Sequence, residues 1–213
     1  VETGVNLATA HSIGEQSITG GCLAITVFEG TAAHTESRHA ETHALLAASG
    51  GTSLGEAPAR AWEQGRFDAP YLRDSLLKAG AICETLETAT TWSNVPTLKA
   101  AVTEALTSAL SASGTNALLM CHISHVYPTG ASLYFTIVAG QRGDVAQQWH
   151  AAKVAACDAI IANGGTITHH HAVGADHRPW MAAEIGDLGV AVLRAVKQTL
   201  DPVGILNPGK LIP

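Results

Sequence analysis

The sequence predicts an α+β fold in which an antiparallel sheet is covered by helices. Short runs of branched and aromatic residues alternate with longer segments whose apolar residues recur at helical spacing. Two of the short runs are joined by the turn Pro-Thr-Gly at residues 128–130, which is typical of an antiparallel hairpin. Helices packed against one face of such a sheet would bury the apolar side of both kinds of element.

In the first part of the chain we expect one strand and two helices. An apolar run at 21–30 predicts the strand, because it is short and rich in branched and aromatic residues. Residues 32–49 predict a helix that Gly50 and Gly51 end. After a polar stretch with glycines and prolines, residues 69–80 predict a second, short helix.

The centre of the chain carries the clearest pattern. Residues 81–92 predict a strand, and residues 93–114 predict a helix with Pro96 in its first turn and Gly114 at its end. One apolar stripe runs along this helix: Val95, Leu98, Val102, Leu106 and Leu110. Residues 116–127 and 131–140 are the two strands of the hairpin.

The last part of the chain predicts two helices, with a brief strand between them. The first helix covers about 143–163, and Gly164 and Gly165 lead into a short strand that carries three consecutive histidines. The last helix covers 178–200 and is followed by a tail broken by proline and glycine. Five apolar residues share one face of this helix: Met181, Ile185, Leu188, Val192 and Val196. Twice, the order of elements resembles half of a ferredoxin-like unit, so we expect a duplicated arrangement.

Composition limits the classes of function. The 213 residues are 46% hydrophobic and 14% charged, which is typical of a globular protein and not of a disordered one. The net charge is -6 and basic residues do not cluster, so we expect no nucleic-acid partner. The cysteines are widely spaced and indicate reduced thiols, at Cys22, Cys83, Cys121 and Cys157. We therefore expect a cytoplasmic protein, with attachment to a membrane surface left open.

The histidine triplet His169–His171 is the most unusual feature of the sequence. It is suited to a metal site, to proton transfer and hydrogen bonding near an anionic cofactor, or to a polar edge without chemistry. On a regular strand neighbouring side chains alternate, so His169 and His171 would face one way and His170 the other. A metal would then need two of the three together with His125 or a carboxylate from elsewhere.

The hairpin is the second candidate. His125 and Tyr134 flank its turn, and two of the three tyrosines in the chain, Tyr127 and Tyr134, lie here. Loops held by a rigid sheet often carry function. Composition alone favours the alternative, that both tyrosines are ordinary aromatic residues of a strand.

Taken together, these motifs resemble the C-terminal half of FAD-linked oxidases of the vanillyl-alcohol oxidase superfamily, and within it the alkyl-dihydroxyacetonephosphate synthase family. The resemblance is carried by "SHVYPTGASLYF", "IANGGTITHHHAVG" and "DPVGILNPGKL", and by "CLAITVFEG", "YLRDSLL" and "ETLETATTWSNVPTL" in the same order. It implies a cap or substrate domain at 1–165 and a C-terminal segment at 166–213 that completes the active site and contacts a flavin domain.

The resemblance also implies roles for individual residues. Tyr134 is expected to be the acid–base residue, assisted by His170 and His171, while Arg73 holds an anionic head group and His125 lies with the substrate. The triplet is expected beside the flavin, and Asn207 and Lys210 in the tail are expected to contact the same cofactor.

The resemblance predicts no metal. In related 2-hydroxy-acid dehydrogenases, a hairpin reading GHxGDGNxH and a later EHGxG motif bind a divalent ion. Here Tyr134 stands in place of the second histidine and His170 in place of the glutamate, and the alternating triplet is poorly arranged for one ion. We therefore expect none at His125 or His169–His171.

The function that the resemblance implies is the exchange of an acyl for an alkyl chain on a dihydroxyacetone phosphate ester, with FAD acting without net redox. An FAD-dependent oxidoreductase of hydroxy acids or alcohols and a non-enzymatic interaction domain are the alternatives. The glycine-rich pyrophosphate loop of the family is absent from these residues, so we expect an N-terminal FAD-binding domain as partner and a colourless, inactive chain without it. The substrate is expected to be lipid-like or small and anionic, and a homodimer is left open.

Overall fold

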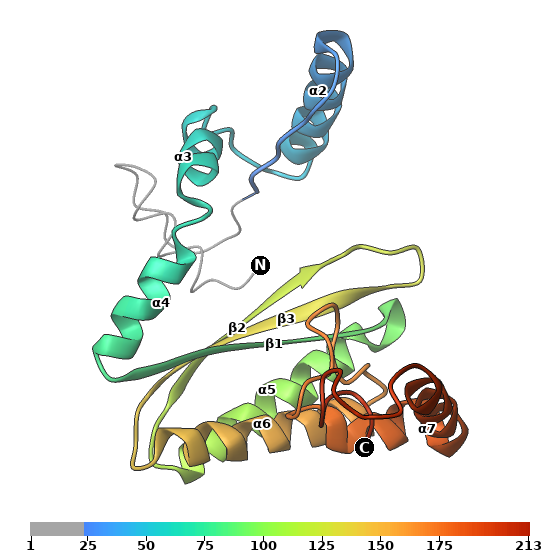
Figure 1. The fold of residues 1–213 in the computed structure, drawn as a ribbon. Coiled ribbons are helices and arrows are strands. Elements are labelled where there is room, and N and C mark those ends of the chain that lie inside the picture. The colour runs from blue at the N-terminus through green and yellow to red at the C-terminus, as the bar shows by residue number, and fades with distance from the viewer. Residues whose placement is uncertain (1–23) are drawn as a thin grey trace. The chain divides into compact units, whose positions relative to one another are not determined.

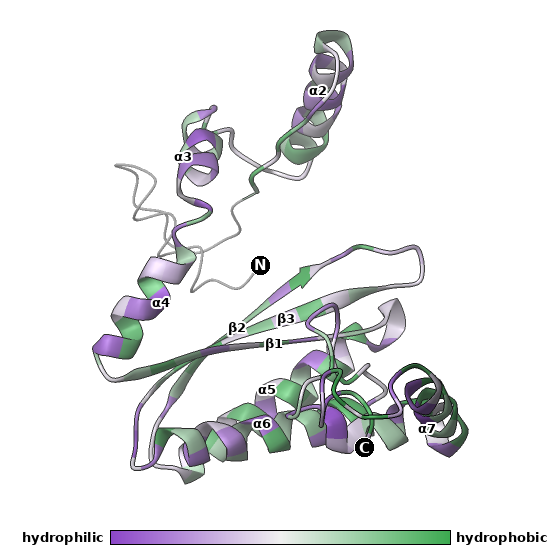
Figure 2. Ribbon diagram, viewed as in Figure 1, coloured by the Kyte–Doolittle hydropathy of each residue, from purple (hydrophilic) through white to green (hydrophobic). Residues whose placement is uncertain are grey.

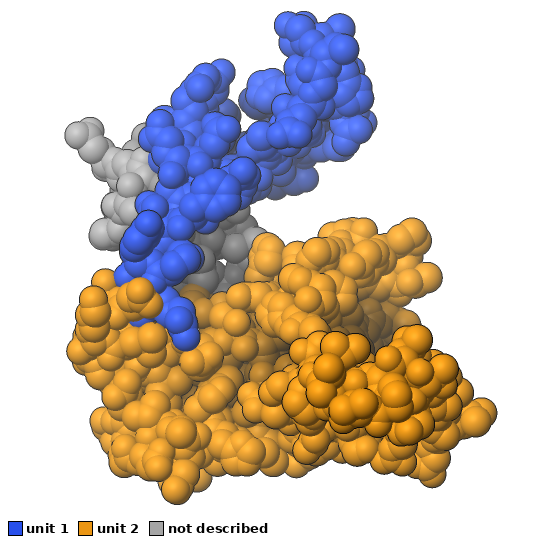
Figure 3. Space-filling model, viewed as in Figure 1, with its two compact units in different colours: residues 1–73 blue, residues 74–213 orange. Residues whose placement is uncertain are grey.

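The computed structural model describes residues 24–213 of the chain and divides it into two compact units, residues 1–73 and 74–213 (Figure 3). The boundary expected after residue 165 falls inside the second unit, so the functional division proposed there stays a prediction. Residues 21–23 of the expected first strand, including Cys22, lie outside the described residues.

The described part of the first unit is helical. Helix α2 spans Ala32–Ala48, α3 spans Ala57–Gly65, and α4, which begins in this unit, spans Ala69–Lys78 (Figure 1). Helices α2 and α4 confirm the sequence-based prediction, whereas α3 was not expected in that polar stretch. The predicted strand at 21–30 is wrong over its described residues, because 24–29 form neither helix nor strand. A short apolar run becomes a strand only where a partner strand accepts its hydrogen bonds.

The second unit contains a three-stranded antiparallel sheet of order β1-β3-β2. Strand β1 spans Ala81–Thr91, β2 spans Ala117–Ser124 and β3 spans Gly130–Gly140. The hairpin β2–β3 and the antiparallel α+β class are confirmed. Among the described residues there is one β-α-β-β-α unit. Its register places Glu87 of β1 directly opposite Tyr134 of β3.

Two helices pack against one face of this sheet, α5 at Val95–Ala112 and α6 at Val145–Ala162 (Figure 1). All five residues of the predicted α5 stripe are buried, at 7% relative exposure or less. They meet alternate residues of β3, because a strand directs every second side chain to the same face: Ala131, Leu133, Phe135, Ile137 and Ala139. Burying each of these larger side chains contributes about 1.5–3 kcal/mol, so this layer is the main core of the unit.

The ends of α6 are set by its sequence. The Asp144 carboxylate accepts hydrogen bonds from the Ala146 and Gln147 amides at the N-terminus. At the C-terminus Gly164 has φ +68°, and the Gly165 amide donates to the Ile160 carbonyl oxygen, which makes a Schellman motif. Glycine is needed at 164 because other residues rarely adopt that left-handed conformation. The chain therefore leaves α6 in a fixed direction toward the edge of the sheet.

Helix α7 spans Met181–Leu200 and is interrupted at Gly186, whose backbone is not helical (φ 73°, ψ 166°). Of the five residues predicted to share one face of this helix, Met181 is buried at 6% exposure, whereas Leu188 is 80% exposed. The remaining three are exposed as well: Ile185, Val192 and Val196. Figure 2 shows hydrophobic residues along α7 and the tail that follows it. None of the helices in the described residues is long and apolar enough to cross a membrane.

Candidate functional site

The face of the sheet that the helices leave uncovered carries polar groups. Tyr134 of β3 faces Glu87 of β1 on one side and His122 of β2 on the other. The neighbours Leu133 and Phe135 point to the helical face and are fully buried. Because successive side chains of β3 point to opposite faces, one face of the sheet is hydrophobic and the other carries the ionisable side chains.

The segment 163–174 runs along the free edge of β1. The backbone N–H groups of Thr166 and His169 donate to the carbonyl oxygens of Ala89 and Glu87, both at 3.0 Å. The Thr88 hydroxyl donates to the Thr166 carbonyl oxygen at 2.6 Å. These hydrogen bonds satisfy only part of the edge, and the segment is a loop. The predicted strand at the histidines is therefore wrong.

Residues of α6 and α7 also hold this loop in place. The Glu184 carboxylate accepts from the Ile167 amide at 2.8 Å and from the Thr166 hydroxyl at 2.5 Å. Ile167 packs with Cys157 and Met181 in a second, smaller buried cluster. Burial raises the pKa of the Cys157 thiol to about 11, so this thiol is a packing group and not a nucleophile.

The triplet turns sharply at its middle residue. His170 has φ +41°, in the left-handed region, and the His171 amide donates to the His169 carbonyl oxygen at 2.6 Å. Because of this turn the three side chains do not alternate, and all three converge on Glu87. The distances from ring nitrogen to carboxylate oxygen are 3.3 Å for His169, 2.7 Å for His170 and 3.2 Å for His171.

His125 completes the group from the hairpin loop. It also has a left-handed backbone, at φ +46°, and its Nε2 lies 4.0 Å from the nearer Glu87 oxygen. Its ring lies 4.9 Å from the ring of His169 and 5.1 Å from that of His170, measured between centroids. The Tyr127 hydroxyl forms a hydrogen bond of 3.0 Å with His169 Nε2, which leaves Nδ1 of that ring facing Glu87.

Tyr134 lies beside this group and not within it. Its ring meets His171 edge-on, with 5.7 Å between the ring centroids. Burial lowers the pKa of His171, an effect that the neighbouring Glu87 carboxylate opposes. The contact places an imidazole next to a phenol, two groups that commonly take part in proton transfer.

The Glu87 carboxylate is a buried polar group whose oxygens make no hydrogen bonds. Its side chain is 1% exposed, and neither of its oxygens makes a hydrogen bond of acceptable geometry. The same holds for Nδ1 of His169 and the hydroxyl of Thr168. A buried carboxylate is normally compensated by a paired charge or a metal ion, and the groups that surround Glu87 are the imidazoles of the triplet and of His125.

Two premises of the expectation that no metal binds are contradicted. Because the triplet is not an extended strand, its side chains do meet, and Glu87 supplies the carboxylate that the triplet itself lacks. One ligand atom each from Glu87, His125, His169 and His170 all lie within 4.8 Å of one another. Whether an ion binds there stays a prediction to test.

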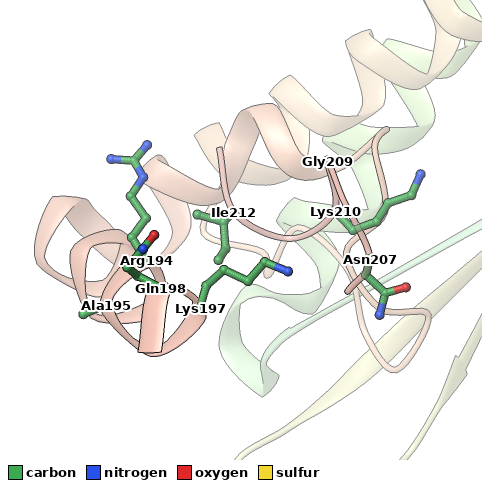
Figure 4. A pocket seen from close by; sticks show the side chains of 8 residues that line it. All are labelled: Arg194, Ala195, Lys197, Gln198, Asn207, Gly209, Lys210 and Ile212. Atoms are coloured by element: carbon green, nitrogen blue, oxygen red, sulfur yellow. The ribbon is translucent and has the colours of Figure 1, made fainter. Parts of the chain in front are cut away.

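The other predicted residues lie elsewhere in the chain. Asn207 and Lys210 line an open cavity of about 540 Å³ beside α7, together with Arg194, Lys197 and Ile212 (Figure 4). Arg73 is an exposed residue of α4 and the last residue of the first unit, so its role at the substrate stays a prediction. Sequence reasoning missed Glu87, because the predicted strand holds two glutamates, Glu84 and Glu87, and nothing in its pattern singles out the second.

The chain is similar in sequence to a known family of flavoenzyme domains. Residues 2–211 match the family described as FAD linked oxidases, C-terminal domain. The chain is 34% identical to the alkyldihydroxyacetonephosphate synthase of Trypanosoma brucei brucei over 90% of its length, and 35% identical to that of Dictyostelium discoideum over 90%. It spans only 31% and 32% of those two relatives.

A solved structure of an alkyldihydroxyacetonephosphate synthase superposes with a TM-score of 0.62 at 30% identity, covering 86% of this chain and 30% of that one. A more distant relative is an uncharacterized FAD-linked oxidoreductase of Escherichia coli K12, 27% identical over 66% of this chain and 30% of its own length.

Proposed function

Because the chain belongs to the family of C-terminal domains of FAD-linked oxidases, we propose that it is the substrate-domain portion of an FAD-dependent enzyme that exchanges an acyl for an alkyl chain on a dihydroxyacetone phosphate ester. The proposal takes its reaction from the relatives, which match over 90% of this chain. The observation that carries it to particular residues is the edge-on contact between Tyr134 and His171 at the uncovered face of the sheet.

Tyr134 is assigned the proton transfer that accompanies the exchange. A phenol has a pKa near 10 and needs neighbouring groups before it can act near neutral pH. His171 is its neighbour, and His170 lies next to His171, with 4.9 Å between ring centroids. Arg73 is assigned to the anionic head group, since its planar fork is suited to phosphate or carboxylate.

The residues of the site fit a flavin. The His170 side chain is 55% exposed, so part of its ring is accessible to a cofactor. Exposed apolar residues of α7 and of the tail, such as Leu188, Val192 and Val203, suit a covering domain. We assign that cover to an FAD-binding domain, whose flavin supplies the nucleophilic nitrogen for the exchange. We assign Asn207 and Lys210 to contacts with this flavin.

An FAD-dependent oxidoreductase of hydroxy acids or alcohols is the alternative, favoured by the similarity to FAD-linked oxidoreductases. The two functions separate under anaerobic conditions. A synthase exchanges fatty acid for fatty alcohol with no electron acceptor, whereas an oxidoreductase reduces its flavin with a hydroxy acid and then stops.

For the whole enzyme we propose a cytoplasmic location at a membrane surface, where its lipid substrates partition. Co-sedimentation with lipid vesicles tests this proposal.

The decisive experiment uses the full-length protein that contains this chain and the substitution Tyr134→Phe. The change deletes one hydroxyl and keeps the ring, so folding is spared. Loss of a positioned acid–base group lowers the rate by about 100- to 10,000-fold, and we expect kcat of the exchange to fall within that range.

Tyr127→Phe is the matched control, because it also removes a phenolic hydroxyl, from a tyrosine on the other side of the hairpin turn. It breaks the contact with His169 but keeps the contact between Tyr134 and His171, so kcat should fall much less than in Tyr134→Phe. Turnover of Tyr134→Phe at the wild-type rate would show that Tyr134 is not the acid–base residue. Absence of exchange in the wild-type protein, with flavin bleaching by a hydroxy acid, would establish the alternative.

A further inference from the structure

Four potential ligands come together from three separate segments of the second unit. Glu87 is in the middle of β1, His125 follows β2, and His169 and His170 belong to the loop along the β1 edge. Each offers one ligand atom, and these four atoms lie within 4.8 Å of one another. Convergence of this kind is set by the sheet register and by two left-handed histidines, and not by closeness in sequence.

The carboxylate at the centre has an unmet requirement. Glu87 is buried, its oxygens lack hydrogen bonds, and its ion-pair partners among the described residues are imidazoles. Carboxylates that are buried in proteins are usually paired with a charge or bound to a metal ion. A divalent cation would balance the Glu87 carboxylate and would also occupy the free nitrogen of His169.

One imidazole is already oriented as a metal ligand. His169 uses Nε2 for its hydrogen bond with the Tyr127 hydroxyl and turns Nδ1 toward Glu87. Metal-bound histidines commonly use one ring nitrogen for the ion and the other for a hydrogen bond that fixes the ring. Nδ1 of His169 is buried and has no hydrogen-bond partner, which is the state expected of a ligand nitrogen facing a cation site.

We propose that Glu87, His125, His169 and His170 bind a single divalent transition-metal ion, with Zn²⁺ as the best match. Three imidazoles and one carboxylate form a nitrogen-rich donor set, which is suited to Zn²⁺ and not to Ca²⁺ or Mg²⁺. The site goes beyond the proposed function and does not rest on it.

The geometry requires only a modest contraction. Ligands at about 2.1 Å from a tetrahedral ion lie roughly 3.4 Å apart, against a largest separation of 4.8 Å here. The side chains of His125 and His170 are 45% and 55% exposed, so they have the freedom to close on an ion and they leave it a path from solvent. His171 stays outside the ligand set, beside Tyr134.

The test measures metal content and affinity, independently of catalysis. Full-length protein is stripped with a chelator, dialysed, and titrated calorimetrically with Zn²⁺; Co²⁺ is added in parallel, because its visible spectrum reports four-coordinate nitrogen and oxygen ligation. We expect one ion per chain, a Co²⁺ band typical of tetrahedral ligation, and a higher Tm with Zn²⁺ than without it.

Glu87→Gln and His170→Gln remove one ligand each, and both should raise Kd for Zn²⁺ by about 100-fold or more, since even loss of a supporting partner costs 10- to 100-fold. His122→Gln is the matched control: an exposed histidine of β2 outside the group, it should leave Kd unchanged. Circular dichroism of each metal-free variant separates loss of a ligand from loss of folding.

Three outcomes would overturn the site: no saturable binding to the wild-type protein, wild-type affinity in both ligand variants when folded, or equal weakening in His122→Gln. None of these outcomes bears on the exchange reaction, which Tyr134→Phe tests separately.

Discussion

Gly165 decides how the histidine loop packs against the rest of the unit, and replacing it with alanine is the most direct test of that packing. A Cβ at this position would lie 2.8 Å from Leu98 Cδ2, 2.8 Å from Thr88 Oγ1 and 3.1 Å from Ile160 Cγ2. All three neighbours are buried at 2% exposure or less. Thr88 is further held by its hydrogen bond to Thr166, so none of the three has free space into which to move.

The magnitude follows from two opposing effects. Forcing an extra methyl into a well-packed interior costs about 1–3 kcal/mol, and three fixed neighbours place Gly165→Ala in the upper half of that range. Alanine also restricts the unfolded chain, which returns about 0.4–1 kcal/mol, because Gly165 does not need a left-handed backbone. The net loss is therefore about 2 kcal/mol, which corresponds to a fall in Tm of about 4–8 °C for a chain of this length.

Thermal and urea unfolding of the wild-type protein, Gly165→Ala and Gly174→Ala measure this loss. Gly174 is in the same loop, but no atom lies within 4 Å of the point that a methyl group would occupy there, and its φ is not left-handed. Alanine at 174 should therefore not destabilise the unit, and the same restriction of the unfolded chain should raise its stability by about 0.4–1 kcal/mol. If Gly165→Ala melts with the wild type while keeping the same urea m-value, the loop is not packed on Leu98 and Thr88, and the placement of the triplet loses its support.

Two further predictions concern the tail and the first unit. The Lys197 ammonium donates to the Asp201 carboxylate and holds its pKa at about 2, below its ordinary 3.8, so the stability contributed by Asp201 is present above about pH 4 and is lost as the pH falls toward 2. Urea unfolding of wild type and Asp201→Asn from pH 6 to pH 2 should show a gap that narrows over this window, and a gap independent of pH would contradict the ion pair. Arg73→Lys keeps the charge but loses the planar fork, so KM for an anionic substrate should rise while kcat changes little. A fall in kcat with KM unchanged would rule out a role of Arg73 in substrate binding.

Much of the fold was predictable because it depends on local periodicity. The α5 stripe from Val95 to Leu110 repeats every three to four residues, and all of it is buried. Periodicity did not reveal what covers a face, however. The residues of α7 such as Leu188 and Val192 share a face as predicted, yet they are exposed in this chain. Their pattern is equally consistent with burial against another element of the same unit or against another domain.

The site was only half predictable, since its members were recognisable but its geometry was not. The triplet, His125 and Tyr134 stood out by residue type. The turn at His170 did not, because a single left-handed residue leaves no mark on composition or period, and few histidines adopt it. An alternating strand was the natural expectation, and it led to the wrong conclusion that the triplet could not converge.

Glu87 shows why the remaining part of the site needed the structure. Its position depends on the pairing of β1 with β3, which joins residues 47 positions apart, Glu87 and Tyr134. A slip of one residue in that register would move Glu87 to the face that carries Phe135 and Leu133, where no imidazole could reach it. The hydrophobic residues of β1 and β3 therefore do more than build the core. By fixing the register, they place the carboxylate on the opposite face, and the same edge of β1 then binds the loop that delivers the three histidines to it.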